Sequence, residues 1–581
     1  LSVPFMERFF LLAKFGSDKQ IAGWTGQITS NSFMKREFGT KVIEEYLIRQ
    51  DLRLIVDTSG AYIPGHGTPT VILVGKHQRP VQQSIRAVLG VRGEPSQPKD
   101  PANGSVWRAI VENLDAPGFE GPWVSVTDLP RQSMATHPWS LSGGGAVEAL
   151  QVISSQSDRL SSHVDSIGFA AITGDDAVFV SENTVPHAWR RSGVGAREFI
   201  EGERIRDFTI SGSSNSIYPY VASSSIGKRS IAGLGGSEAF WPFRTVLRNG
   251  LAFHQTREER GLEWYEYMLP NWPRLDSSKL IAFAEVTTHN HFVLNPGERV
   301  FNRSAPVIKL PAVATDNDYF GLLGILNSST VCFWLRQSCG AKGGSGIGRG
   351  IQAEAWMERY NFNSSNVGEI PLTSELPAAA GKLMCNLAES ASNLTPSNWK
   401  NSCDLTSDAL AQNAVAYKSL RHQMIALQEE IDWEVYRHFG LLDEDLTDLS
   451  AQRPDVVFGQ RAFEIVLARQ MRSGTTSSAW FERHGSIPVT EIPPEWPADY
   501  RELVQRRINA IETNPNIRLL EKPEYKRRWT IESWETQQER GLRRWLLDKL
   551  EDRSFWFDVQ ERPTARSISQ LADMVSRDHE L

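Results

Sequence analysis

The chain has 581 residues, of which 40% are hydrophobic and 23% charged, and this length is more than one hydrophobic core usually supports. The composition is that of a folded multidomain protein, and the absence of an apolar run of roughly 18 residues argues against a membrane role. The net charge of -7 provides no overall attraction to nucleic acid, so any DNA contact must come from local basic patches.

The cysteines and the first residues bear on the cellular compartment. Four cysteines are too few for a disulfide scaffold and lack the paired spacing of a zinc site, which predicts a reducing, cytoplasmic environment. These residues are Cys332, Cys339, Cys385 and Cys403. The chain opens with Leu-Ser-Val-Pro, without a charged signal-peptide segment, and residues 5–10 look like a helix entered midway. We therefore expect further residues before Leu1.

The beginning of the chain predicts alternating helices and strands. Residues 5–13 have a helical apolar spacing, and a strand is expected at residues 23–29. A helix should follow at residues 35–46, where apolar residues spaced like one helix face leave Lys35 and Arg36 toward solvent. The apolar face comprises Phe38, Val42, Ile43 and Tyr46.

Two further strands are predicted at residues 52–57 and 70–75, which are rich in β-branched residues and joined by a Gly- and Pro-rich loop. A parallel α/β sheet would continue with another helix, so two consecutive strands predict that the last one returns antiparallel. That ending is characteristic of the methyltransferase variant of the doubly wound fold, although topology alone does not exclude other α/β proteins. Residues 1–80 are therefore predicted to form the C-terminal half of a Rossmann-like sheet.

The rest of the chain divides into four predicted segments. Residues 81–202 are Ser- and Gly-rich and are expected to be an irregular insertion region. In residues 203–372 short strand-like runs alternate with aromatic clusters, which predicts a mixed α+β recognition domain. Residues 373–450 have the pattern of a helical spacer, and residues 451–581 that of a helical tail. The predicted fold class is thus α/β, followed by α+β and α-helical parts.

Six stretches of sequence carry a resemblance to a known family. Two of them are Gln-Ile-Thr-Ser-Asn-Ser-Phe-Met-Lys-Arg-Glu-Phe-Gly at residues 27–39 and Asp-Thr-Ser-Gly-Ala-Tyr-Ile-Pro-Gly-His-Gly-Thr-Pro-Thr at residues 57–70. The others are residues 258–265, 301–311, 430–436 and 479–485. With these stretches the chain resembles the phage growth limitation (Pgl) methyltransferases of type 2 bacteriophage exclusion (BREX) systems over nearly its whole length. More distantly, it resembles fused restriction-modification enzymes, in which a target-recognition domain and helical spacers follow the methyltransferase.

The resemblance implies transfer of a methyl group from S-adenosylmethionine to N6 of a flipped-out adenine in double-stranded DNA. In that family a Gly-containing turn holds the donor and an Asn-Pro-Pro-Tyr/Phe motif binds the adenine, and neither is present here. The one Gly-rich candidate, residues 142–146, follows no predicted strand and is interpreted as a loop. The resemblance therefore implies the C-terminal part of such an enzyme, inactive alone and without catalytic residues of its own, with other BREX proteins as further partners.

Several residues are predicted to lie at the edge of the base or donor pocket. Ser30, Asn31 and Ser32 follow the first strand at the carboxyl edge of the sheet, where ligands bind in such folds. Their alternative role is a helix cap, with Asn31 or Ser32 accepting from the first amides of the next helix. Tyr62 and His66 lie in the Gly- and Pro-rich loop over the same edge, where Tyr62 could stack on a base and His66 meet a phosphate. The alternative is a tight connection with Tyr62 packed beneath it.

Four basic residues are predicted to bind DNA: Lys35 and Arg36 near the first sheet, and Lys342 and Arg349 further along the chain. Residues 342–350 combine the last two with five glycines, so backbone amides and cationic side chains could both approach phosphate. The segment lacks Gly-Lys-Ser/Thr and is not a nucleotide-binding P-loop. A surface loop without a ligand remains the alternative.

Other polar clusters are given structural interpretations. Thr-His-Asn-His at residues 288–291 has no further ligand at suitable spacing, so we predict a strand end and no metal. The basic clusters at residues 506–507 and 526–528 are interpreted as solvated helix faces. A different class of function also stays open, namely a non-catalytic DNA-specificity or protein-assembly subunit of a restriction or defence system.

Overall fold

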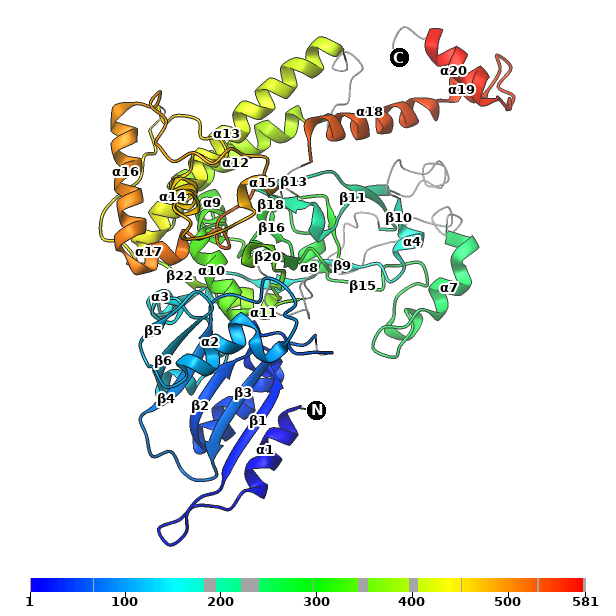
Figure 1. Ribbon diagram of the computed structural model, residues 1–581. Coiled ribbons are helices and arrows are strands. Elements are labelled where there is room, and N and C mark those ends of the chain that lie inside the picture. The colour runs from blue at the N-terminus through cyan, green and yellow to red at the C-terminus, as the bar shows by residue number, and fades with distance from the viewer. Residues whose placement is uncertain are drawn as a thin grey trace.

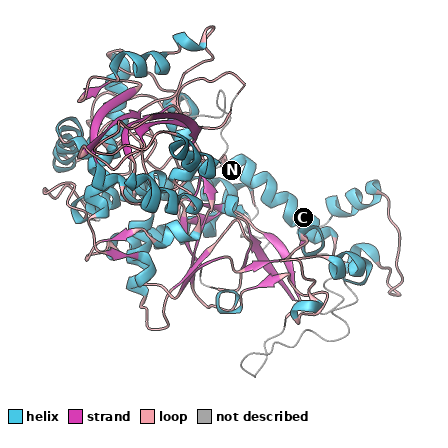
Figure 2. Cartoon of the chain, turned by 90° about the horizontal axis from the view of Figure 1, so that it is seen from below, coloured by secondary structure: helices cyan, strands magenta, loops and turns pink. Residues whose placement is uncertain are grey.

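The computed structural model contains a strand-rich N-terminal part and a larger mixed part with helices at its C-terminal end (Figure 1). Figure 2 shows two separate groups of strands with helices between and around them. The structure describes residues 2–65, 67–181, 195–220, 240–295, 297–342, 354–396, 406–450, 452–529 and 532–577. The predicted mixture of helix and sheet is therefore confirmed.

The N-terminal sheet, here called the first sheet, has six strands in the order β1-β3-β2-β4-β6-β5. These are β1 (Trp24–Ser30), β2 (Asp51–Asp57), β3 (Thr70–Lys76), β4 (Ser84–Gly90), β5 (Phe119–Glu120) and β6 (Val124–Pro130). The strands β1, β2 and β3 confirm the three predicted strands. β3 runs antiparallel to both β1 and β2, as expected for a returning strand. The sheet continues beyond residue 80, because β4 pairs with β2 in parallel and with β6 antiparallel.

The first sheet is covered on both faces. On one face Met6 and Phe10 of α1 (Ser2–Leu12) pack with Phe33 and the inward side chains of β2 and β3. On the other face Val106 and Ile110 of α2 (Ser105–Asn113) pack against valines of β2, β4 and β6. No residue of β2, β3 or β4 is fully exposed, which is the pattern of strands in a sheet that is covered on both faces.

The prediction of one continuous helix at residues 35–46 is wrong. The segment instead forms short 3-10 and π turns: η1 (Asn31–Met34), η2 (Glu37–Gly39), η3 (Val42–Tyr46) and η4 (Leu47–Arg49). Gly39 explains the interruption, since a Cβ there would lie 1.7 Å from the carbonyl oxygen of Phe33. Val42 and Ile43 are buried as predicted, whereas Phe38 is 53% exposed.

The middle of the chain builds two four-stranded sheets, β10-β14-β11-β19 and β18-β16-β20-β8, and several strand pairs. The strands are β7 (Asp158–Arg159), β8 (Ser166–Gly168), β9 (Ala171–Ile172), β10 (Val180–Ser181), β11 (Gly195–Ile200), β12 (Ile205–Arg206), β13 (Thr209–Ile210), β14 (Ser214–Tyr218), β15 (Leu269–Pro270), β16 (Leu280–Phe283), β17 (Val286–Thr287), β18 (Phe292–Asn295), β19 (Val300–Phe301), β20 (Val307–Lys309), β21 (Tyr360–Asn361) and β22 (Pro371–Leu372). The helices of this part are α3 (Ala146–Ser154), α4 (Asp176–Phe179), α7 (Arg244–Asn249), α8 (Trp272–Leu275), α9 (Asp316–Leu326), α10 (Ser329–Ser338) and α11 (Ser364–Gly368).

The C-terminal third is helical, and its longest element is α13 (Ser407–His438). This helix confirms the helical pattern predicted for this part of the chain. The other helices are α12 (Ala378–Leu394), α14 (Ala462–Arg472), α15 (Trp480–Arg483), α16 (Ala498–Thr513), α17 (Pro515–Leu520), α18 (Trp534–Leu550), α19 (Arg553–Trp556) and α20 (Ile568–Arg577). One apolar core joins α9 and α10 to α12, α13, α14, α16 and α17, so the middle of the chain and its C-terminal helices are stabilised together. Among the described residues, no helix combines the length and apolar character needed to cross a membrane.

Candidate functional site

The carboxyl ends of β1 and β2 lie at one edge of the first sheet, because both strands run antiparallel to β3. There the Asn31 amide donates to Ser59 Oγ at 2.9 Å. The Ser59 amide donates in turn to the carboxylate of Asp57 at 2.9 Å. The predicted pocket-edge residues therefore do meet the end of the neighbouring strand.

Ser30 takes the capping role that the sequence suggested for its neighbours. Its hydroxyl accepts from the backbone amide of Ser32 at 3.3 Å, and the two hydroxyl oxygens lie 2.9 Å apart. Asn31 is hydrogen-bonded to Ser59. All three residues from Ser30 to Ser32 therefore have hydrogen-bond partners within the protein. This edge is a connected polar network that fixes the turn after β1.

The prediction that Lys35 faces solvent is wrong, because its side chain points into the protein and connects the first sheet to the middle of the chain. Its Nζ donates to the carbonyl oxygen of Arg336 in α10 at 2.9 Å. Burial lowers the pKa of Lys35 to about 8, against the opposing influence of Cys339, Glu358 and Asp57. Arg36, by contrast, is exposed.

The substitution Lys35→Met is expected to remove a pH-dependent gain in stability. The unfolded chain holds the lysine proton up to its ordinary pKa near 10.4, so this group makes the free energy of unfolding rise as the pH passes from about 8 toward 10. Urea denaturation at pH 7.5 and 9.5 should show a gain about 1–2 kcal/mol smaller in the variant than in the wild type. Lys41→Met, at an exposed position of the same segment, is the control and should leave the gain intact. Equal gains in the wild type and Lys35→Met would contradict the assignment.

Of the remaining predicted site residues, the structure describes Tyr62 and Lys342. Tyr62 is half-buried, and its hydroxyl accepts from Gln97 Nε2 at 2.7 Å. Lys342 is exposed, and its backbone amide donates to the carbonyl oxygen of Arg359 at 2.8 Å. His66 and Arg349 lie outside the described residues.

Residues 288–291 immediately precede β18 and contact the C-terminal tail (residues 451–581). His289 Nε2 lies 2.9 Å from the carbonyl oxygen of Tyr525. The guanidinium of Arg336 donates to the carbonyl oxygens of Thr288 and Glu524, both at 3.2 Å. The Thr-His-Asn-His segment is therefore part of an interface between distant stretches of the chain. Within the described ranges, no three His, Cys, Asp or Glu side chains are grouped as metal ligands would be.

The prediction of solvated faces for the two basic clusters is wrong for three residues. Arg507, Lys526 and Arg527 are each only 1% exposed. Arg507 pairs with Glu430 at 2.5 Å, and Arg527 with Asp207 at 3.2 Å. These cations are buried because acidic partners from distant segments surround them, which the local charge pattern does not reveal.

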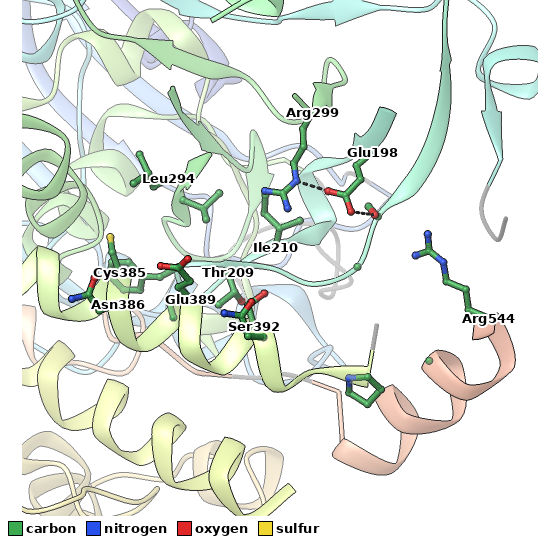
Figure 3. A pocket seen from close by; sticks show the side chains of 18 of the residues that line it. Glu198, Thr209, Ile210, Leu294, Arg299, Cys385, Asn386, Glu389, Ser392 and Arg544 are labelled. Atoms are coloured by element: carbon green, nitrogen blue, oxygen red, sulfur yellow. Dashed lines mark hydrogen bonds and ion pairs between the residues drawn. The ribbon is translucent and has the colours of Figure 1, made fainter. Parts of the chain in front are cut away.

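A cavity of about 1070 Å³ lies between the middle strands, α12 and α18 (Figure 3). Figure 3 shows Arg299 and Glu198 pointing toward each other, and their side chains pair at 2.6 Å. Arg544 faces the cavity from α18, and Glu389 lines it from α12. None of the predicted site residues that the structure describes lines this cavity, whose wall carries both signs of charge.

A second cavity of about 310 Å³ contains three arginines, of which only Arg528 belongs to a cluster that the sequence analysis named. Arg206, Arg359 and Arg528 line it together with residues of the Thr-His-Asn-His segment. Because the arginines come from three widely separated places in the chain, no local sequence signal could have grouped them.

Comparison with known proteins identifies relatives of the whole chain and of its C-terminal part. The family model "Domain of unknown function (DUF7008)" matches residues 424–581. The adenine-specific methyltransferase PglX of Streptomyces coelicolor is 42% identical over 606 residues, which cover 100% of this chain and 49% of the relative. The chain thus spans about half the length of the curated relative it matches.

Two solved structures show weak similarity. The type IIL restriction-modification enzyme MmeI, solved in complex with DNA, has a TM-score of 0.38 at 12% identity and matches 72% of this chain and 47% of its own. The type IIG restriction endonuclease BpuSI has a TM-score of 0.29 at 11% identity, with 72% and 48% covered. Scores this low support no argument about the arrangement of this chain.

Proposed function

Because the chain is related over its whole length to the adenine-specific methyltransferase PglX, we propose that it is part of a DNA adenine-N6 methyltransferase of a bacterial BREX antiphage system. In this proposal it supplies DNA recognition and part of the catalytic fold. The observation that carries the proposal is the 42% identity, which extends over 100% of the chain and therefore includes both the first sheet and the C-terminal tail.

The first sheet supports a role as part of a methyltransferase fold. The antiparallel β3 lies between β1 and β2, as the returning strand of such a fold would. β1 is an edge strand, and Trp24 and Ile28 on it are each 60% exposed. An apolar edge with unpaired backbone groups is suited to continue into further strands. We propose that the rest of a Rossmann-like sheet covers it in the intact enzyme.

S-adenosylmethionine would supply the methyl group in that enzyme, but the residues of this chain do not fit a donor site. The donor-binding turn and the Asn-Pro-Pro-Tyr/Phe motif are absent from the sequence. Asn31, Asp57 and Ser59 are bonded to one another, and neither cavity described above is lined by them. The donor is therefore proposed to be held by residues outside this chain. The proposed role of this chain is limited to the border of the base or donor pocket, formed by Ser30, Asn31, Ser32, Tyr62 and His66.

DNA binding is proposed for residues 203–372, here called the target-recognition region. Lys342, the first residue of the glycine-rich segment 342–350, is exposed and is suited to phosphate contact, as proposed also for Arg349 and Arg36. Lys35 would act from the interior, since its Nζ is bonded to the carbonyl oxygen of Arg336. Double-stranded DNA is the proposed partner, and other BREX proteins would contact the remaining surface.

The proposal is tested by methyl transfer from labelled S-adenosylmethionine to unmethylated DNA. A chimera in which this chain replaces the matching part of the Streptomyces coelicolor relative should label adenine N6, whereas this chain alone should not. DNA binding by the chain alone, measured by fluorescence anisotropy, provides a readout that does not depend on folding of the chimera. A chimera that binds DNA and donor without labelling adenine would favour a non-catalytic specificity subunit.

A further inference from the structure

The small cavity of about 310 Å³ lies where the target-recognition region meets the C-terminal tail. Arg206 at the end of β12, Arg359 before β21 and Arg528 of the tail all line it. Thr288 and His291 add a hydroxyl and an imidazole. We call this cavity the arginine pocket.

The three arginines have no carboxylate partner within the described part of the chain. One nitrogen of Arg206 donates to the carbonyl oxygens of Gly202 at 3.1 Å and Ile205 at 2.6 Å. Arg528 donates to the hydroxyl of Thr288. None of the ion pairs between described residues includes Arg206, Arg359 or Arg528.

The two acidic residues that line the pocket do not neutralise it. Asp207 pairs with Arg527 at 3.2 Å and approaches Arg421 at 3.7 Å. These two arginines do not line the pocket, and they balance the charge of Asp207. The Glu203 side chain is 73% exposed and 3.9 Å from Arg204. Burial, assisted by the charges of Arg336 and Arg206 and opposed by Asp207, lowers the pKa of Arg528 to about 10. An arginine does not release its proton under these conditions, so an unbalanced positive charge remains.

His291 adds a neutral donor to these cations. Its Nδ1 accepts from the Asp207 amide at 3.2 Å and from Arg527 at 2.8 Å. A guanidinium can only donate, so Nδ1 carries no hydrogen and the proton resides on Nε2. Burial, followed by the charge of Arg527, holds the pKa of His291 well below its ordinary value, which keeps the ring neutral.

We propose that the arginine pocket binds a phosphate group. Guanidinium groups match the geometry of phosphate oxygens, and hydroxyl and imidazole donors complete such a site. The volume is at the small end of ligand cavities, which suits a single anionic group. Arg359 is exposed, and its carbonyl oxygen accepts from the amide of Lys342, so a further exposed cation lies beside this arginine of the pocket.

The source of the phosphate follows from the proposed function, on which this part of the inference rests. A backbone phosphate of double-stranded DNA is the expected ligand, and a free phosphate-bearing molecule has the same chemistry. A contact to the DNA backbone would fix the position of the target-recognition region on the duplex without reading its sequence.

The test compares the double variant Arg206→Gln/Arg359→Gln with wild type and with Arg248→Gln. Arg248 lies on α7, outside the pocket, and pairs with Glu258 at 2.8 Å near the surface, so it controls for loss of an arginine. Inorganic phosphate binding is measured by isothermal titration calorimetry. Binding of a non-specific DNA duplex is measured by fluorescence anisotropy at several NaCl concentrations, and thermal unfolding checks that each variant is folded.

The double variant should lose inorganic phosphate binding, and its plot of log K against log[NaCl] should be shallower by about one unit than that of wild type. Phosphate binding by wild type with an unchanged DNA slope in the variant would assign the pocket to a free phosphate compound. Wild type that binds phosphate but no DNA would preserve the pocket and overturn the proposed function. No phosphate binding by wild type, together with equal DNA slopes, would overturn the pocket itself.

Discussion

Replacement of Lys526 by methionine is expected to destabilise the protein by about 3–5 kcal/mol, because it removes the cation from a buried group of carboxylates. Lys526 Nζ lies 2.8 Å from Asp432, 2.9 Å from Glu521 and 3.2 Å from Glu429. All four side chains are almost completely buried. Without the ammonium group, negative charge would stay in the interior or be neutralised by proton uptake.

The pH dependence separates this electrostatic cause from simple loss of packing. Burial already raises the pKa of Glu429 to about 7, although Lys526 opposes the shift. In the variant the pKa of Glu429 should rise further above its unfolded value of about 4.3, so stability is retained at low pH and lost as the pH rises. Urea denaturation should therefore show a larger deficit at pH 8 than at pH 5.5.

The control for this prediction is Lys382→Met on α12, where the lysine is exposed. This substitution makes the same chemical change at the surface and should alter stability by less than about 0.5 kcal/mol. A Lys526→Met deficit that is equally small, or that does not grow with pH, would show that the ion pairs seen in the structure do not contribute as described.

Trp480→Ala is the second substitution with a large expected effect, about 3–5 kcal/mol of destabilisation through loss of buried surface and creation of a cavity. The indole of Trp480 is fully buried, with ring centres 5.5 Å from Trp356 and 5.6 Å from Phe463. Its Nε1 also donates to Glu464 at 3.0 Å. The matched control is Trp241→Ala, at a side chain that is 62% exposed.

His484 provides a second readout for the Trp480 substitution. The two rings lie 4.1 Å apart, and burial lowers the pKa of His484 to about 4. Removing the indole should admit water and raise this pKa toward 6.5, measurable by NMR titration of the imidazole in folded Trp480→Ala protein. A folded variant with an unchanged His484 pKa would mean that other side chains keep the ring dry.

Three of the six strands of the first sheet, β1, β2 and β3, could be predicted because their β-branched residues and apolar pattern are local properties. The strands β4, β5 and β6 were not predicted, since they lie in the Ser- and Gly-rich segment after residue 80. The returning β3 also followed from the order of elements, without any knowledge of distant contacts. The segment from Asn31 to Arg49 could not be predicted, since the close approach of Gly39 to the carbonyl oxygen of Phe33 is a tertiary contact. Apolar spacing alone favoured a helix there.

Prediction of the candidate site has a similar limit. Ser30, Asn31 and Ser32 were assigned to the sheet edge correctly because the turn directly follows a strand. The buried cations were missed because their partners are far away in the chain, as with Arg507 and Glu430. The arginine pocket likewise requires residues from the target-recognition region and the tail at once. A single sequence does not specify which distant charges will meet.

The bonds of Arg527 bear on whether residues 203–372 could be transplanted without the tail. Besides Asp207 and His291, its guanidinium donates to the carbonyl oxygens of Asn290 at 2.9 Å and Asn327 at 3.2 Å. A graft of the target-recognition region into another scaffold would leave these acceptors buried without their donor. Recombination between relatives should therefore succeed only when residues 521–529 are inherited together with that region, although about 150 residues separate the two in sequence.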